Sequence, residues 1–158
     1  MIKIIAVGKV KEKFITAAIE EYLKRLSAYD KVEISEIPDE KIPEKASEKK
    51  EEKIKELEGD KILKKVKDND FLIALDLKGR EFDSLSFASY LDQVRTYKSS
   101  SVAFAIGGSL GLSSKVLQRA DCNWKLSNLT FPHQLCRLIL IEQIYRAFKI
   151  NNNEIYHK

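Results

Sequence analysis

Short apolar runs alternate with longer amphipathic segments along the whole chain. Hydrophobic residues that are consecutive, or that alternate with polar ones, predict five strands, at residues 2–7, 32–37, 70–77, 101–106 and 124–127. Apolar residues at helical spacing predict helices between them, at residues 14–26, 39–67, 84–94, 113–119 and 133–149. This alternation is typical of an α/β protein with a mainly parallel sheet flanked by helices. No repeat or flexible linker divides the chain, so we expect one domain over residues 1–158.

Two of the predicted helices differ sharply in polarity. Residues 38–68 carry ten lysines and ten acidic residues, which cancel, so we expect a charged surface helix without chemistry. The last helix is apolar almost all round and begins next to Pro132, whose fixed φ suits a helix start. A helix this apolar needs burial on more than one face, which predicts a subunit interface. We also expect Ser84 to cap its helix and Lys78-Gly79 to end the third strand.

Composition limits the classes of protein that this chain can form. It is 44% apolar and 33% charged with six glycines and three prolines, which excludes collagen-like and wholly disordered chains. No apolar run approaches the roughly 20 residues that span a bilayer, and the short apolar start does not have the form of a signal peptide. Cys122 and Cys136 lie far apart without metal-ligand spacing. We expect a reduced, cytoplasmic protein that holds no metal.

The net charge of +4 is concentrated in the C-terminal third. Residues 112–158 carry seven basic residues against three acidic ones, which equals the excess of the whole chain. A polyanion such as RNA is one partner that this excess fits. An excess of this size also occurs in proteins that bind nothing acidic.

The glycine loop Gly107-Gly108-Ser109-Leu110-Gly111 directly follows a predicted buried strand. Ligands of parallel sheets bind beyond the carboxyl ends of strands, where glycines let backbone amides approach them. The spacing matches neither the dinucleotide-binding fingerprint nor a phosphate loop. The loop therefore predicts either a nucleotide-like ligand held by backbone atoms or only a tight strand-to-helix turn.

Two further segments combine polar and apolar groups where a ligand could lie. Residues 126–134 link a strand end to a helix start and can offer backbone groups to a purine, or can be an ordinary capped loop. The tail ends in Tyr156-His157-Lys158, which is either a frayed terminus or a proton acceptor, ring and cation that reach a partner subunit. No nucleophile elbow or metal-ligand cluster appears elsewhere.

Several ordered motifs resemble one known family over essentially the whole chain. They are Ala6-Val7-Gly8-Lys9, Ile106-Gly107-Gly108 with Gly111, Leu126-Ser127 with Leu129-Thr130-Phe131-Pro132-His133, Glu142-Gln143 with Tyr145-Arg146-Ala147, and the terminal Tyr156-His157. In this order they resemble the ribosomal RNA large subunit methyltransferase H family, a branch of the SPOUT methyltransferases. The resemblance implies an α/β fold with a C-terminal trefoil knot, and a homodimer with its active site at the interface.

The resemblance also implies a reaction and a cofactor pocket. The family transfers a methyl group from S-adenosylmethionine to N3 of a pseudouridine in 23S rRNA of the assembled ribosome. The implied cofactor-binding residues are Leu75, Gly107, Gly108, Leu126, Ser127, Asn128, Leu129, Thr130 and Phe131. A sulfonium methyl is already activated, so the protein has to align donor and acceptor and remove the N3 proton, without a metal.

We assign the catalytic roles as a hypothesis on this chemistry. His157, delivered by the partner subunit, takes the proton or positions the base, and Tyr156 stacks on or orients the base. Arg137 and Lys158 stabilise the developing charge and hold RNA phosphate. His133 and Glu142 are secondary candidates.

Two other classes of function remain open at this point. A non-catalytic RNA-binding ribosome assembly factor would use the basic C-terminal third but would not need a cofactor pocket. A knotted methyltransferase acting on tRNA or on another rRNA nucleotide would share the pocket and differ in substrate. Binding of S-adenosylmethionine separates the first class from the family, and the labelled RNA separates the second.

Overall fold

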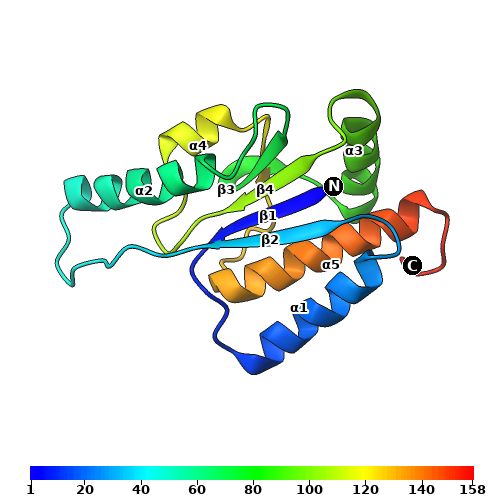
Figure 1. The fold of residues 1–158 in the computed structure, drawn as a ribbon, viewed down its shortest axis with the longest axis horizontal. Coiled ribbons are helices and arrows are strands. Elements are labelled where there is room, and N and C mark those ends of the chain that lie inside the picture. The colour runs from blue at the N-terminus through cyan, green and yellow to red at the C-terminus, as the bar shows by residue number, and fades with distance from the viewer.

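A single five-stranded parallel sheet forms the centre of the molecule in the computed structural model, which describes residues 1–158 (Figure 1). The strands are β1 (Ile2–Val7), β2 (Val32–Ile37), β3 (Phe71–Glu81), β4 (Val102–Ile106) and β5 (Cys122–Lys125). Their order in the sheet is β2-β1-β4-β3-β5, and every neighbouring pair is parallel. The prediction of an α/β fold with a parallel sheet is therefore confirmed.

Helices cover both faces of this sheet. They are α1 (Lys13–Leu26), α2 (Glu48–Leu63), α3 (Ser84–Tyr97), α4 (Ser114–Arg119) and α5 (His133–Asn151). Helix α5 packs between α1 and α3 on one face, and α2 packs with α4 on the other (Figure 1). The larger core lies under α1, α3 and α5, and a smaller one lies under α2 and α4. None of these helices combines the length and hydrophobicity that crossing a bilayer requires.

Local chemistry moves several boundaries from their predicted places. The charged helix begins at Glu48 rather than near residue 39, because Ser47 caps it by accepting a hydrogen bond from the Lys50 N–H. Asp83, not Ser84, caps α3: its carboxylate accepts from the Ser86 N–H, and the Ser86 hydroxyl accepts from the Asp83 N–H. The prediction of Ser84 as the cap was therefore wrong by one residue.

The third strand continues through Lys78-Gly79 instead of ending there. It loses register, because Leu75 and Arg80 both pair with Trp124 of β5 and the intervening residues bulge outward. A Cβ at Gly79 would lie 2.5 Å from the Asn123 carbonyl carbon, so the two backbones approach more closely than any side chain permits. The glycine therefore marks a close crossing of β3 and β5, and the bulge leaves residues 76–79 without a partner in β5.

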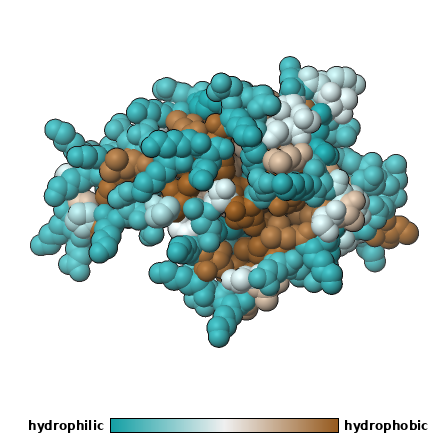
Figure 2. All heavy atoms as spheres, in the orientation of Figure 1, coloured by the Kyte–Doolittle hydropathy of each residue, from teal (hydrophilic) through white to brown (hydrophobic).

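Part of the apolar surface of α5 is not covered by the rest of the chain. Its inner face is buried, including Leu140, Ile141 and Ile144, while Leu138 and Ile139 are half-exposed. Hydrophobic residues accordingly gather over α5 on the face shown in Figure 2. This exposed apolar area is what the prediction of a subunit interface requires.

Candidate functional site

The loops that follow β4 and β5 meet the bulge of β3 at the carboxyl edge of the sheet. Together they enclose a cavity of about 660 Å³, a size typical of ligand sites. The glycine loop after Ile106 forms one wall, and the segment from Leu126 to His133 forms another. The order β1-β4 at the sheet centre is a crossover point of the kind where parallel sheets bind ligands.

This cavity gathers the residues predicted to bind the cofactor. Those that line it are Leu75, Gly107, Gly108, Leu126, Ser127, Leu129, Thr130 and Phe131. Asn128 does not line it, because its side chain turns to Lys125 and accepts a hydrogen bond from Nζ at 2.7 Å. The geometry thus brings together segments that are far apart in the sequence, while which of these residues contact a cofactor stays a prediction.

The glycine loop turns back on itself tightly. The Gly111 N–H donates to the Gly108 carbonyl at 3.0 Å, which closes a turn over the cavity. A Cβ at Gly107 would lie 2.7 Å from the Gly111 carbonyl carbon, so a side chain cannot be accommodated there without moving backbone. Gly111 has φ +86°, a conformation that glycine adopts without strain.

Further residues line the same cavity. Ser109, Leu110, Gly111 and Pro132 belong to the two loops singled out as candidate ligand sites, and Ile106 ends the strand before the first of them. Sequence reasoning missed Asp76, Leu77, Trp124 and Cys136, and the last two had no signal in the sequence. Burial raises the pKa of the Cys136 thiol, which therefore stays protonated at neutral pH and does not act as a nucleophile.

Two buried polar atoms next to the cavity have no hydrogen-bond partner within the chain. They are Nδ1 of His133 and Nε1 of Trp124, and both residues line the cavity. Both atoms are shielded by the protein around them, and the His133 ring packs against Gly8. The site offers a glycine cradle within an apolar hollow, which suits a purine nucleoside.

Glu58 lies behind the glycine loop and was missed because its segment reads as a solvated helix. Only 5% of it is exposed, and a Cβ at Gly108 would lie 3.4 Å from its Oε1. Its other oxygen accepts the Glu40 N–H at 3.1 Å. Burial raises the pKa of this carboxyl above its ordinary value, because desolvation disfavours the charged form.

Replacing Glu58 by glutamine is expected to stabilise the protein at neutral pH. A raised folded-state pKa means that the stability Glu58 contributes is present below pH 4.5 and is lost as the pH rises through the folded pKa. Glutamine keeps the acceptor for Glu40 and stays neutral. The melting temperature of Glu58→Gln should therefore exceed that of the unmodified protein by more at pH 8 than at pH 4.5. The exposed Glu56→Gln is the control, and an equal shift in both variants would contradict this assignment.

The C-terminal tail folds back on α5 of its own chain. The Tyr156 hydroxyl donates to Oε1 of Glu142 at 3.1 Å, and the Arg146 guanidinium lies 4.7 Å from the centre of the Tyr156 ring. Burial, with the neighbouring Tyr22 and Glu142, raises the pKa of Tyr156 to about 12. Tyr156 is therefore a hydrogen-bond donor at neutral pH, not a base. Glu142 itself pairs with Arg146 at 2.7 Å.

His157 is held by the same arginine. Its Nδ1 lies 3.1 Å from Nη1 of Arg146. A guanidinium can only donate, so Nδ1 accepts and the ring proton is on Nε2. Arg146 is about 20 Å along the helix axis from His133, which lines the cofactor-sized cavity. In this arrangement the tail does not deliver His157 to that cavity.

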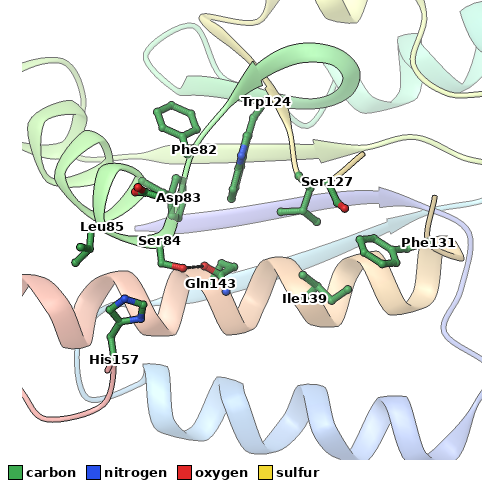
Figure 3. Close-up of a pocket in the computed structure, with 12 residues that line it drawn as sticks. Phe82, Asp83, Ser84, Leu85, Trp124, Ser127, Phe131, Ile139, Gln143 and His157 are labelled. Atoms are coloured by element: carbon green, nitrogen blue, oxygen red, sulfur yellow. Dashed lines mark hydrogen bonds between the residues drawn. The ribbon is translucent and has the colours of Figure 1, made fainter. Parts of the chain in front are cut away.

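A second, smaller cavity of about 460 Å³ runs along α5 beside the first. Figure 3 shows His157 near one end and Phe131 near the other, with Ser84 bonded to Gln143 between them at 2.8 Å. The two cavities share Trp124, Leu126, Ser127 and Phe131 as a common wall. A planar group bound in the smaller cavity would therefore lie next to one bound in the larger.

The structure places the remaining predicted catalytic residues in different settings. Arg137 is 1% exposed: Nη1 pairs with Glu36 at 2.8 Å, and Nη2 donates to the Gly8 carbonyl at 3.1 Å. Burial alone would raise the pKa of Glu36, but the bonds from the Val10 N–H and Arg137 lower it below its ordinary value. Arg137 thus braces the loop after β1, and its predicted contact with RNA phosphate has no support in this arrangement. Lys158 is exposed and makes no ion pair.

The basic excess of the C-terminal third is largely neutralised within the chain. Its ion pairs are Lys115–Asp60, Arg119–Asp121, Lys125–Glu81, Arg137–Glu36, Arg146–Glu142 and Lys149–Glu154. Charge counted along the sequence therefore overstates what this region offers to a polyanion. The chain brings together no group of three or more His, Cys, Asp or Glu side chains that could hold a metal ion.

Comparison with known proteins matches this geometry to one family. The family model described as "Predicted SPOUT methyltransferase" matches residues 1–157. A ribosomal RNA large subunit methyltransferase H from Clostridium botulinum is 57% identical over 157 residues, and one from Bacillus thuringiensis is 54% identical. A relative named ribosomal RNA large subunit methyltransferase H 1, from Clostridium perfringens, is 55% identical. Each alignment covers 99% of both chains.

A solved structure supports the fold independently of close sequence similarity. The chain superposes on a structure described as a probable methylase family protein from Haemophilus influenzae with a TM-score of 0.53. The match covers 99% of this chain and 70% of the other at 13% identity. Likeness at this level of identity concerns the fold alone.

Proposed function

The chain belongs to the ribosomal RNA large subunit methyltransferase H family of SPOUT methyltransferases, and from that membership we propose that it methylates large-subunit ribosomal RNA with S-adenosylmethionine. The target we propose is N3 of a pseudouridine in 23S rRNA of the assembled ribosome. One observation carries the proposal: relatives of this name are 54–57% identical over 99% of this chain and 99% of their own length.

The larger cavity supports S-adenosylmethionine as the methyl donor. Its glycine loop lets backbone amides approach a ligand, and Leu75, Leu126 and Leu129 supply an apolar surface for a purine. When bound, the cofactor supplies a methyl group attached to a positively charged sulfur. The sulfur becomes a neutral thioether once the methyl group is transferred.

The chain's own task is to align the acceptor and to remove its proton. As the bond from N3 to the methyl carbon forms, the N3 proton has to pass to a base. Because its pKa is raised, the Tyr156 phenol stays protonated and donates a hydrogen bond that orients a carbonyl group of the pseudouridine. We assign the acceptor role to the imidazole of His157, which has to leave Arg146 before its Nδ1 can take a proton.

A homodimer would bring the tail to the site. The tail of one chain lies far along α5 from its own larger cavity, while α5 keeps a half-exposed apolar face. Packing of two such faces would bury them and place the tail of one subunit near the cavity of its partner. The C-terminal trefoil knot and a cytoplasmic location, where assembled ribosomes are found, belong to the same proposal.

Labelled S-adenosylmethionine and ribosomes from a strain lacking this gene test the proposal directly. We expect label in 23S rRNA, which mass spectrometry of nucleosides should place on N3 of one pseudouridine. Label in free tRNA, or in another rRNA nucleotide, would keep the family and change the substrate. Binding to ribosomes without transfer of label, and without affinity for S-adenosylmethionine, would instead indicate a non-catalytic assembly factor.

A further inference from the structure

Three lysines between the end of β1 and the first turn of α1 have no ion-pair partner in the chain. Lys9, Lys11 and Lys13 are exposed, and none of them takes part in an ion pair or a side-chain hydrogen bond. Glu12 is the only acid among them, and no acidic residue lies in the first turn of α1. We call residues 9–14 the lysine loop. Glu36 lies close enough to Lys9 to interact with it electrostatically, but its carboxylate is already paired with Arg137, so the lysine loop keeps a net positive charge.

Side chains from β2 and α5 hold the backbone of the lysine loop in place. The Val10 N–H donates to Oε2 of Glu36 at 2.9 Å, and the Lys11 N–H donates to Oε1 of Gln134 at 3.0 Å. Arg137 holds the Gly8 carbonyl just before the loop. The side-chain charges are therefore presented on a braced backbone, which lowers the entropy lost when they bind a partner.

An exposed aromatic ring completes the lysine loop. Phe14 is 70% exposed although α1 buries the neighbouring Ile15 to 5%. A ring left in solvent beside three cations is the combination by which proteins hold single-stranded nucleic acid, the cations on phosphates and the ring on a base. The nearest exposed residues of α1 are Lys13, Thr16 and Ala17, and no other large apolar side chain of this helix is exposed, so a protein partner would find little apolar surface around the ring.

The lysine loop lies at the same sheet edge as the larger cavity. Strand β1 pairs with β4, with Ala6 opposite Ile106, so the loops that follow these two strands are neighbours. The lysine loop is bonded to Gln134, next to His133 in the cavity wall, and Figure 1 shows it passing the start of α5 on its way to α1. An RNA strand with one base in the cavities could therefore extend over this loop.

We propose that the lysine loop binds the RNA strand that flanks the methylated nucleotide: Lys9, Lys11 and Lys13 contact phosphates, and Phe14 stacks on an unpaired base. The proposal rests on the proposed function, because it names the surface that positions the RNA substrate of that site. It replaces the C-terminal third as the source of positive charge, since the cations of that third are paired within the chain apart from Lys158.

Neutralising the three lysines tests the phosphate contacts. The triple variant Lys9→Ala, Lys11→Ala, Lys13→Ala is expected to raise KM for ribosomes about tenfold or more, with kcat and affinity for S-adenosylmethionine unchanged. The slope of log affinity against log salt should fall by about 2, since three contacts to single-stranded phosphate are lost. The matched control is Lys49→Ala, Lys50→Ala, Lys53→Ala on α2, which removes the same charge on the opposite face of the sheet.

Substitutions of Phe14 test stacking separately from charge. Phe14→Ala is expected to weaken ribosome binding between about fivefold and a hundredfold, and Phe14→Trp should restore it. Phe14→Leu keeps an apolar side chain without a stacking ring and should bind like the alanine variant. A change in the mass of the assembly on Phe14→Ala would assign the ring to a protein contact and overturn the stacking.

Ribosome binding measured by co-sedimentation without S-adenosylmethionine keeps this proposal separate from the proposed function. Failure of the unmodified protein to methylate ribosomes would reject the proposed function, whereas binding would still report on the loop. Equal ribosome affinity and salt slope for the lysine-loop variant and the unmodified protein would overturn the proposal. Equal losses in the lysine-loop and α2 variants would also overturn it, because they would show an effect of net charge alone.

Discussion

Deletion of residues 156–158 is expected to abolish methyl transfer while leaving affinity for S-adenosylmethionine largely intact. The deletion removes the imidazole of His157 and the phenol of Tyr156, and loss of general acid–base catalysis alone typically costs about 10²- to 10⁴-fold in rate. Neither residue lines the larger cavity, so cofactor binding has no reason to change. Single-turnover methylation of ribosomes and calorimetric titration of the cofactor measure the two quantities separately. Wild-type turnover in the truncated protein would exclude the tail from catalysis.

Mixing of two inactive variants shows whether the tail acts on its own subunit or on its partner. The truncated protein keeps its cavity, and a cavity-disabled protein such as Gly107→Ala keeps its tail. If the tail acts across the interface, mixed dimers hold one complete site each, and random mixing restores roughly a quarter of the unmodified activity. No recovery would place the tail on its own chain, where the smaller cavity already holds His157.

The hydrophobic periodicity was sufficient to predict the strands and helices, because the residues buried in the core follow it. Every residue of β4 is buried and apolar, and α1 buries Ile15, Ile19 and Leu26 at helical spacing. The boundaries were harder because they depend on single hydrogen bonds, such as the one that Ser47 accepts at the start of α2. The bulge of β3 could not be predicted, since nothing in the strand's own sequence records how closely β5 approaches Gly79.

The residues of the candidate site were predicted or missed for the same reasons. Glycines and strand ends pointed to Gly107 and to the segment after Leu126, because backbone geometry at those places is visible in residue type. Trp124 and Glu58 were missed, since their roles come from what packs against them across the sheet. Arg137 was expected to stabilise the developing charge and to hold RNA phosphate, but its burial against Glu36 and Gly8 depends on a contact between distant parts of the chain.

The lysine loop shows that the charge available to a partner depends on ion pairing in the folded structure and not on the charge along the sequence. The C-terminal third holds the excess along the sequence, yet six of its cations have acidic partners, some of them from other elements, such as Asp60 and Glu81. Lys9, Lys11 and Lys13 lie in a segment whose excess of positive charge is small along the sequence, and they make no ion pair. Electrostatic attraction of a polyanion depends on charge that the fold leaves uncompensated.

Gly107→Ala is expected to have the largest effect of any single substitution in the cavity. Its Cβ would lie 2.7 Å from the carbonyl carbon and 2.8 Å from the carbonyl oxygen of Gly111, and both are backbone atoms that can move only if the turn opens. Opening the turn displaces the amides that face the ligand, and a displacement of about 1 Å in a binding site can cost about a hundredfold in rate. We therefore expect weaker cofactor binding together with a similar loss of methyl transfer.

The matched control is Gly111→Asn in the same turn. A Cβ at Gly111 meets nothing within 4 Å, and asparagine tolerates a positive φ better than other side chains do, so this change tests backbone conformation without a collision. Affinity for S-adenosylmethionine, measured by calorimetry, should fall at least tenfold more in Gly107→Ala than in Gly111→Asn. Melting temperatures of the two variants show whether the loss of affinity is local, because none of residues 107–111 belongs to the buried core. Unchanged affinity in Gly107→Ala would mean that cofactor binding does not depend on this turn.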